Sequence, residues 1–191
     1  MSSHHIVLEK QEPALLVLGL DTFPAEMLGQ LLEWNPTVIT TKETAQQLID
    51  FGIKIDWVIT DNPHSAVQSD VKFMPVGNDT PAEAALKYLV THNYPAVNVI
   101  CDDLQLKDYL FFADKINLVI FHNDQKIYPV NSGFSKWKPA GDKIEILTHQ
   151  HDVSYSGLES LGNHQFSTIH DGFFSLWFEG PAFLFIAEKV S

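Results

Sequence analysis

Acidic side chains follow several short β-rich runs of the sequence, at the point where each run ends. Asp61 and Asp79 each follow one such run, and the pair Asp102 and Asp103 follows another. In an open parallel sheet, the loops beyond the carboxyl ends of the strands build the ligand crevice. Carboxylates from three such loops suit a magnesium ion, which prefers oxygen ligands. Aspartate is also an ordinary turn and capping residue, and Asp79 in particular has the place of a helix N-cap.

Histidines form a second group with possible chemistry. His149 and His151 would share one face of a strand, and His164 and His170 belong to neighbouring expected strands. Imidazoles on adjacent strands can hold zinc. No fixed ligand spacing is present, however, so we favour a polar hairpin turn over a zinc site for residues 149–152.

Nucleophilic catalysis has little support. No serine stands in the sharp glycine-flanked turn that such hydrolases use. Cys101 is the only cysteine, and its acidic neighbours disfavour a thiolate. A single cysteine excludes an internal disulfide and a thiolate zinc cluster and fits a reducing compartment. With no secretion signal evident at the start of the chain, we expect a cytoplasmic protein.

The overall charge excludes one class of partner. The 191 residues carry a formal charge of −12, and all twelve basic residues are lysine, so we expect no binding to nucleic acid. The absence of arginine removes the planar fork that grips phosphate at two points, so lysine or a metal would have to replace it. The longest apolar stretches are far shorter than the roughly 20 residues of a membrane span, so we expect no membrane partner.

The first 120 residues alternate β-rich runs with amphipathic helical segments. We expect strands at 15–20, 38–40, 56–60, 71–75, 96–101 and 117–121, and helices at 24–33, 43–51, 79–89 and 104–115. Alternation of this kind predicts an α/β fold, with a mostly parallel, Rossmann-like sheet covered by helices. The sheet would bring the acidic strand ends to one edge.

After about His122 the helical periodicity disappears. Strand-like runs separated by turn residues follow at 126–130, 143–148, 152–155, 164–170, 173–178 and 182–187. They predict a carboxyl-terminal antiparallel β-sandwich. We therefore expect an α/β domain at 1–124 and a sandwich domain at 125–191. Half of the aromatic side chains near the end of the chain should lie in the core, and the rest, Trp177 among them, are free for a flat ligand or a subunit interface.

Several motifs share their spacing with a known family. One known signature has the form ADGGAN, about ten residues, then PD, a short apolar strand and GDFDS. Its first part aligns with residues 41–46 (Thr-Lys-Glu-Thr-Ala-Gln), and its PD aligns with residues 55–56 (Ile-Asp). GDFDS then falls on residues 60–64 (Thr-Asp-Asn-Pro-His) without a gap. Residues 77–81 fall on its KDxTD element, with Pro81 in place of the final aspartate. The chain from about residue 37 onward thus resembles the thiamine pyrophosphokinases.

Two further elements extend this resemblance. Residues 101–109 can be placed on the family's GAxGGRxDH element, in which only Asp108 matches; Leu106 takes the place of the arginine and Lys107 is the only nearby cation. Residues 156–159 are similar to the GL(K/R)Y turn. Ser167 and Thr168 lie where a serine-asparagine pair helps to hold thiamine in the family.

The resemblance implies a fold, a reaction and a set of site residues. The fold is an α/β domain followed by a β-sandwich, and the reaction is magnesium- and ATP-dependent transfer of pyrophosphate to thiamine in a homodimer formed through the sandwich. It implies catalytic roles for Asp61, Asp79 and Asp108, ligand binding by Lys42, Thr80, Lys107, Ser167 and Thr168, and metal binding by Asp61, Asp102 and Asp103. Pro63 and Pro81 replace metal-binding aspartates. An inactive relative that binds thiamine or another ring compound, and a dimeric scaffold, are therefore the alternatives.

Overall fold

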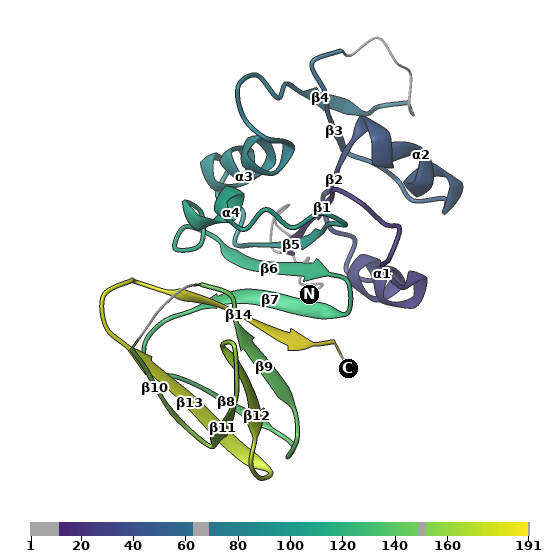
Figure 1. The fold of residues 1–191 in the computed structure, drawn as a ribbon. Helices are drawn as coiled ribbons and strands as arrows, with labels where there is room; N and C mark the ends of the chain where they lie inside the picture. The colour runs from purple at the N-terminus through teal and green to yellow at the C-terminus, as the bar shows by residue number, and fades with distance from the viewer. Residues whose placement is uncertain (1–11, 63–68, 149–151, 191) are drawn as a thin grey trace, which may run out of the picture. The chain divides into compact units, whose positions relative to one another are not determined.

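The computed structural model describes residues 12–62, 69–148 and 152–190 (Figure 1). The chain separates into two units between Leu118 and Val119, near the beginning of strand β6 (Asn117–His122). The change of sequence pattern placed the boundary a few residues later, at residue 124. Each unit has its own apolar core.

Parallel strands form the sheet of the first unit. Their order is β5-β1-β2-β3-β4, and every neighbouring pair among them is parallel, as the alternating sequence predicts. Central strand β1 is buried along its whole length. The strands are β1 (Ala14–Val17), β2 (Val38–Thr41), β3 (Trp57–Ile59), β4 (Lys72–Met74) and β5 (Ala96–Ile100).

Among the described residues, three helices connect these strands and a fourth follows β5. They are α1 (Ala25–Leu32), α2 (Lys42–Asp50), α3 (Pro81–Thr91) and α4 (Lys107–Leu110). Leu28 of α1 and Leu48 of α2 pack into one apolar cluster with Leu15 and Val17 of β1, so α1 and α2 cover the same face of the sheet. No helix in the described part of the chain is long and apolar enough to cross a membrane.

The helix predicted at residues 104–115 is much shorter than the sequence indicated. Only Lys107–Leu110 is α-helical, and Leu106 at its N-cap makes no capping hydrogen bond with its side chain. The amides of Phe112 and Lys115 donate to the carbonyls three residues earlier, as in a 3₁₀ turn. The prediction was wrong because amphipathic spacing is common to both conformations, and this segment has no capping residue to favour the α-helix.

Antiparallel strands build the second unit, as predicted. One sheet has the order β11-β12-β9-β14-β7-β6 and the other the order β10-β13-β8. The strands after β6 are β7 (Gln125–Val130), β8 (Phe134–Lys138), β9 (Lys143–Ile146), β10 (Val153–Ser156), β11 (Leu158–Gly162), β12 (Gln165–Thr168), β13 (Gly172–Phe178) and β14 (Leu184–Lys189). Strands β8 and β11 were not predicted.

The second unit has an apolar core between its sheets. Phe174 and Leu176 of β13 and Leu184 and Ile186 of β14 are fully buried in one cluster. Alternate residues of β13 point the other way, so Phe173 and Trp177 stay exposed. This is the division between core and outer aromatics that strand alternation predicts.

Gly157 sits in a turn where a side chain has no room. Its φ is +71°, and a Cβ atom there would lie 2.6 Å from the carbonyl oxygen of Phe173. We expect Gly157→Ala to lower the free energy of unfolding by about 2–3 kcal/mol, because it adds a backbone clash to the strain of a positive φ. Chemical denaturation measures this loss.

Gly162 provides a matched control for that substitution. Its φ is +88°, but no atom lies within 4 Å of the position of its Cβ. Gly162→Ala should therefore cost only about 1 kcal/mol, the strain of the backbone alone. Equal losses for the two variants would show that the close approach of Phe173 contributes nothing.

Candidate functional site

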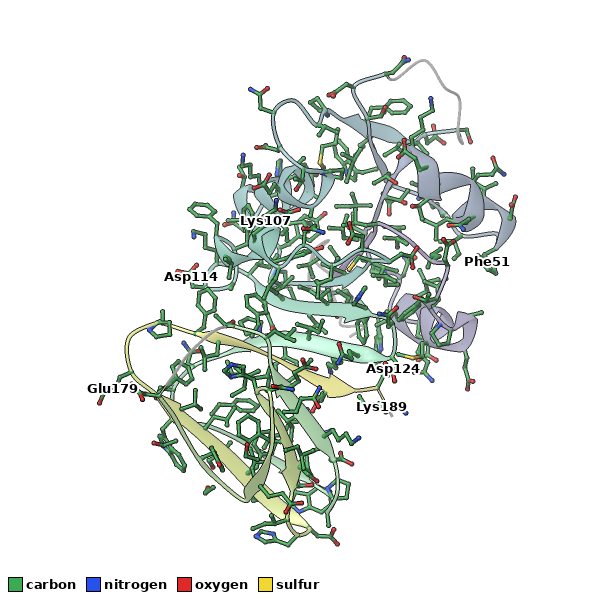
Figure 2. The ribbon with its side chains drawn as sticks, viewed as in Figure 1. Phe51, Lys107, Asp114, Asp124, Glu179 and Lys189 are labelled. Atoms are coloured by element: carbon green, nitrogen blue, oxygen red, sulfur yellow. The ribbon has the colours of Figure 1, made fainter. Side chains whose placement is uncertain are left out.

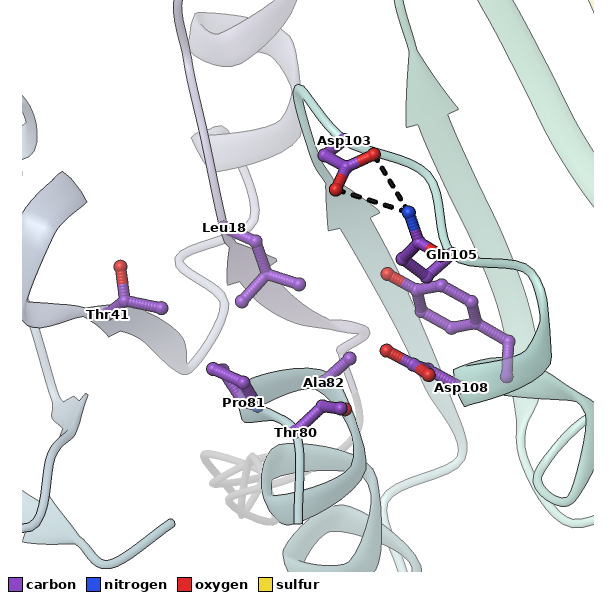
Figure 3. Close-up of a pocket in the computed structure, with 9 residues that line it drawn as sticks. Leu18, Thr41, Thr80, Pro81, Ala82, Asp103, Gln105 and Asp108 are labelled. Carbon is purple, nitrogen blue, oxygen red and sulfur yellow. Dashed lines mark hydrogen bonds between the residues drawn. The ribbon is translucent and has the colours of Figure 1, made fainter.

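A pocket of about 160 Å³ lies at the carboxyl ends of the parallel strands in the first unit (Figure 3). It is smaller than the roughly 300–1,000 Å³ of typical small-molecule sites, so it suits one group of a ligand, such as a phosphate, rather than a whole nucleotide. Its walls come from the ends of β1 and β2, from the start of α3 and from the segment after β5. They comprise Leu18, Thr41, Thr80, Pro81, Ala82, Asp103, Gln105, Asp108 and Tyr109.

Two helices of the first unit begin at this pocket. Thr80 forms a capping box with Glu83: its hydroxyl accepts a hydrogen bond from the Glu83 amide at 3.3 Å, and its own amide donates to the Glu83 carboxylate at 2.9 Å. Thr41 caps α2 by accepting from the Thr44 amide at 3.4 Å. Helix N-termini carry partial positive charge, so this side of the pocket favours an anion.

Asp108 is the acidic residue with the strongest case for a role in this pocket. Asp108 lines the pocket and is only 9% exposed, which is unusual for an acidic residue. In the part of the chain that the structure describes, its carboxylate accepts no hydrogen bond. Because Asp108 lines the pocket, its carboxylate is placed to receive a donor or a cation from a ligand.

Asp103 lies on another wall of the pocket and is exposed. Both of its carboxylate oxygens accept hydrogen bonds from the side-chain amide of Gln105, at 3.1 and 3.2 Å (Figure 3). A neutral side-chain amide uses only part of the acceptor capacity of a carboxylate, so lone pairs remain for a cation. Asp103 is therefore oriented and still available to a ligand.

Tyr109 forms part of the pocket wall, and neither Tyr109 nor the neighbouring Cys101 is placed to act as a nucleophile. Burial raises the pKa of the Cys101 thiol to about 11, although a hydrogen bond from Tyr109 opposes this effect. Burial also raises the pKa of Tyr109 far above its usual range, and its neighbour Cys101 raises it further. Both groups are neutral at physiological pH. This agrees with the view from sequence that Cys101 is not a nucleophile.

Asp61, Asp79 and Asp102 do not line the pocket, and the carboxylate of each makes hydrogen bonds or an ion pair elsewhere. Asp61 accepts hydrogen bonds from the amides of Val76 and Gly77, at 2.8 and 3.1 Å. Asp79 forms an ion pair with Lys87, at 2.5 Å. Their predicted catalytic roles, and that of Asp61 in metal binding, stay predictions.

Asp102 holds the loop that follows β1. Its carboxylate accepts hydrogen bonds from the amides of Asp21 at 3.1 Å and Thr22 at 3.4 Å. A Cβ atom on Gly19 would lie 2.2 Å from the same carboxylate, so only glycine fits there. The Asp102 carboxylate thus faces this loop, and its predicted metal role is not tested.

The predicted ligand-binding lysines flank residues of the pocket wall. Lys42 follows Thr41 and begins α2. Lys107, which is labelled in Figure 2, precedes Asp108 and begins α4. Both side chains are exposed. Neither residue lines the pocket itself, so their predicted roles in ligand binding stay predictions.

The predicted thiamine-binding pair belongs to β12 of the second unit. Ser167 and Thr168 are both buried, with 9% and 3% of their surface exposed. The Thr168 hydroxyl donates to the carbonyl of Pro139 at 2.5 Å and accepts from the amide of Asp142 at 2.9 Å. Its hydrogen bonds therefore shape the turn before β9, and a role of the pair in holding thiamine stays a prediction.

Among residues 12–62, 69–148 and 152–190, no group of three or more histidine, cysteine or acidic side chains is placed to hold a metal ion. His164 and His170 are exposed, while Pro63, His64, His149 and His151 lie outside the described residues. Magnesium commonly uses only one or two carboxylates together with substrate phosphates, and Asp103 and Asp108 both line the pocket.

The pocket also contains residues that were not predicted as site residues. Leu18, Thr41, Gln105 and Tyr109 line it in addition to the predicted Thr80, Asp103 and Asp108. Thr41 directly ends a strand, so the rule that ligands bind at strand ends was a usable signal for it. Nothing in the sequence marks Gln105, whose role depends on its contact with Asp103.

Comparisons with known proteins give likenesses only at the level of structure. No family model and no curated protein sequence matches the chain. A thiamine pyrophosphokinase from Bacillus subtilis superposes over 94% of this chain and 100% of its own, with a TM-score of 0.68 and 12% identity. The enzyme from Geobacillus thermodenitrificans covers 93% and 98%, with a TM-score of 0.63 and 14% identity.

A eukaryotic structure shows the same likeness. The thiamin pyrophosphokinase from Candida albicans superposes over 94% of this chain and 90% of its own, with a TM-score of 0.63 and 8% identity. Such coverage includes both the parallel sheet and the antiparallel strands that follow it. The resemblance noted in the motifs is thus confirmed for the three-dimensional structure, and the chain has the fold of the thiamine pyrophosphokinases.

Proposed function

We propose that the chain is a divergent thiamine pyrophosphokinase, which transfers pyrophosphate from ATP to thiamine and releases thiamine diphosphate and AMP. The observation that supports this most is the position of Asp108, a buried acidic residue that lines a pocket where two helices begin. The fold and the retained spacing of the motifs support the same reaction. In this proposal the first unit is a Rossmann-like nucleotide-binding domain.

The pocket residues have distinct tasks in this reaction. The N-termini of α2 and α3 attract phosphate oxygens, and Lys42 and Lys107 neutralise charge at the mouth of the pocket. The thiamine hydroxyl oxygen forms a bond to the β-phosphorus of ATP while the bond from that phosphorus to the leaving AMP oxygen breaks. Asp108 accepts the hydroxyl proton and then releases it to water.

A magnesium ion has an appropriate ligand in this pocket. Asp103, held by Gln105, would bind it together with phosphate oxygens, as magnesium sites with few protein ligands do. When bound, the ion supplies charge neutralisation at the phosphates. No arginine is available for this task, because the chain contains none.

The test is product analysis with the full chain, ATP, magnesium and thiamine. We expect AMP and thiamine diphosphate to appear in equal amounts, with no AMP when thiamine is left out. ADP in place of AMP would indicate simple phosphoryl transfer or hydrolysis. Failure to form AMP at high protein concentration would contradict the proposed reaction.

A second candidate is a protein that binds a ring compound without turnover. It is favoured by one observation: the carboxylates of Asp61, Asp79 and Asp102 are all engaged in local contacts and do not line the pocket. Under this alternative thiamine raises the melting temperature while no AMP forms, because a ligand that binds only the folded state stabilises it. In both cases we propose a homodimer formed through the second unit.

A further inference from the structure

Asp102 connects two walls of the pocket beyond the point where their strands end. Strands β1 and β5 are neighbours in the sheet, and the amide of Leu18 donates to the carbonyl of Ile100 at 2.8 Å, just past the last paired residues. Further along the chain, the carboxylate of Asp102 accepts hydrogen bonds from the amides of Asp21 at 3.1 Å and Thr22 at 3.4 Å. The Thr22 hydroxyl also donates to it, at 3.4 Å. One side chain thus continues the contact between the two segments.

Gly19 lets this carboxylate approach the backbone of the loop after β1. A Cβ atom on Gly19 would lie 2.2 Å from Oδ2 of Asp102 and 2.6 Å from its Cγ. Gly19 does not have a positive φ, so its backbone conformation is open to other residues. The carboxylate, and not backbone strain, is what excludes a side chain at this position. Gly19 and Asp102 therefore form one packing contact, which a change on either side removes.

The loop is the part that this contact restrains. Residues 21–22 are exposed, so few other contacts hold the middle of the loop in place. The segment after β5 has support of its own: the amide of Asp108 donates to the carbonyl of Gln105 at 3.0 Å, and the Gln105 side chain holds Asp103. Loss of the Asp102 contact should therefore release the loop while Asp103 and Asp108 keep their positions.

The position of the loop matters for the pocket because its first residue lines the wall. Leu18 directly precedes Gly19, and Leu18 and Asp103 lie on two different segments around the pocket (Figure 3). A pocket of about 160 Å³ has room for one small group, so a displaced wall changes how well that group fits. Asp102 does not line the pocket, so its effect on a ligand passes through the loop.

We propose that Asp102 is a positioning residue for the nucleotide. By packing on Gly19 and binding the amides of the loop, it fixes the wall that Leu18 supplies and thereby sets the affinity of the pocket for phosphate groups. The inference rests on the proposed function, in which this pocket binds the phosphates of ATP. It gives Asp102 a task other than the predicted metal binding, and it explains why residue 19 is a glycine.

Calorimetric titration of the full chain with manganese and a non-hydrolysable ATP analogue tests this role. We expect the dissociation constant to rise about tenfold in Asp102→Ala and by the same factor in Gly19→Ala, since a methyl group at residue 19 displaces the carboxylate. The double variant should bind no more weakly than either single variant, because both changes remove one contact. Asp102→Ala only shortens a half-buried side chain, so the fold should be retained.

Gly29→Ala is the matched control for these substitutions. Gly29 belongs to α1, and no atom lies within 4 Å of the position of its Cβ, so this variant should bind the analogue as the wild type does. A Gly19→Ala variant that also binds as the wild type does, or losses that multiply in the double variant, would overturn the positioning role. A wild-type chain that binds no analogue would overturn the proposed function together with this inference.

Kinetics of AMP formation separate positioning from metal binding. Asp102→Ala and Gly19→Ala should each raise the KM for ATP about tenfold and leave kcat within about threefold of the wild type, because Asp103 and Asp108 keep their positions. A loss confined to kcat would mean that Asp102 acts on the reacting groups, and it would overturn the positioning role. Binding of the analogue without AMP formation would contradict the proposed reaction alone, and the calorimetric comparison would then decide the role of Asp102.

Discussion

Asp108→Asn should lower the turnover number for AMP formation by a factor of about 10²–10⁴, the contribution of a general base. Asparagine keeps the size of the side chain but cannot accept the hydroxyl proton of thiamine. Its amide also has donors to place in a pocket where the carboxylate of Asp108 is buried. Steady-state kinetics with thiamine as the varied substrate measure the change.

Asp114→Asn is the matched control for this experiment. Asp114 belongs to the same unit, but its side chain is 62% exposed and pairs with Lys115, at 3.2 Å. Its turnover number should remain that of the wild type. If Asp108→Asn kept full activity with unchanged folding, Asp108 would have no part in proton transfer and the proposed pocket would be wrong.

The second large effect concerns stability, at an ion-pair cluster inside the second unit. Glu188 of β14 is 5% exposed and contacts Lys136 and Lys138 of β8, the latter at 3.0 Å. These strands belong to different sheets, so the cluster joins the two layers. We expect Glu188→Gln to reduce the free energy of unfolding by about 3 kcal/mol, because breaking a buried ion pair leaves charge uncompensated.

The expected loss is at the lower end of the range for such pairs. Lys138 keeps a second partner in Asp142, at 3.2 Å, and Lys136 is one-third exposed to water. Asp124→Asn is the control, since Asp124 pairs with Lys189 at 3.8 Å and both side chains are largely exposed (Figure 2). Its denaturation curve should match that of the wild type. Equal curves for all three proteins would show that the cluster does not stabilise the fold.

The same cluster gives the protein a defined dependence on pH. Burial alone would raise the pKa of Glu188, but the hydrogen bonds from Lys136 and Lys138 outweigh it and hold the pKa below its ordinary value of 4.5. A lowered pKa in the folded state means that the stabilisation is complete above about 4.5 and is lost as pH falls through the folded value. The difference in stability between wild type and Glu188→Gln should therefore shrink below pH 4.5. A difference that stayed constant or grew would contradict this linkage.

The second unit shows why some strands could not be predicted from sequence. Strand β8 has the order Phe-Ser-Lys-Trp-Lys, with the lysines inward and Trp137 outward. This inverts the usual pattern of apolar residues inside, because a glutamate fifty residues later compensates the lysines. Strand β11 is exposed at four of its five positions and has no apolar alternation to detect.

Local signals, by contrast, were sufficient for much of the first unit. The start of α3 could be predicted because Thr80, Pro81 and Glu83 encode the capping box within four residues. Asp103 and Asp108 were predicted as site residues, and both line the pocket. Asp61 and Asp102 have the same sequence context, but their partners are amides distant in the chain, at Val76 and at Asp21. Such contacts arise only from the fold.

The central claim is that this pocket binds the phosphates of ATP with a divalent ion. A crystal structure of the full chain with thiamine, manganese and a non-hydrolysable ATP analogue tests it most directly. We predict an anomalous manganese peak beside the carboxylate of Asp103, with phosphate oxygens at the N-terminus of α3 and the thiamine hydroxyl near Asp108. Manganese and phosphates bound at Asp61 or Asp79, away from this pocket, would contradict the account.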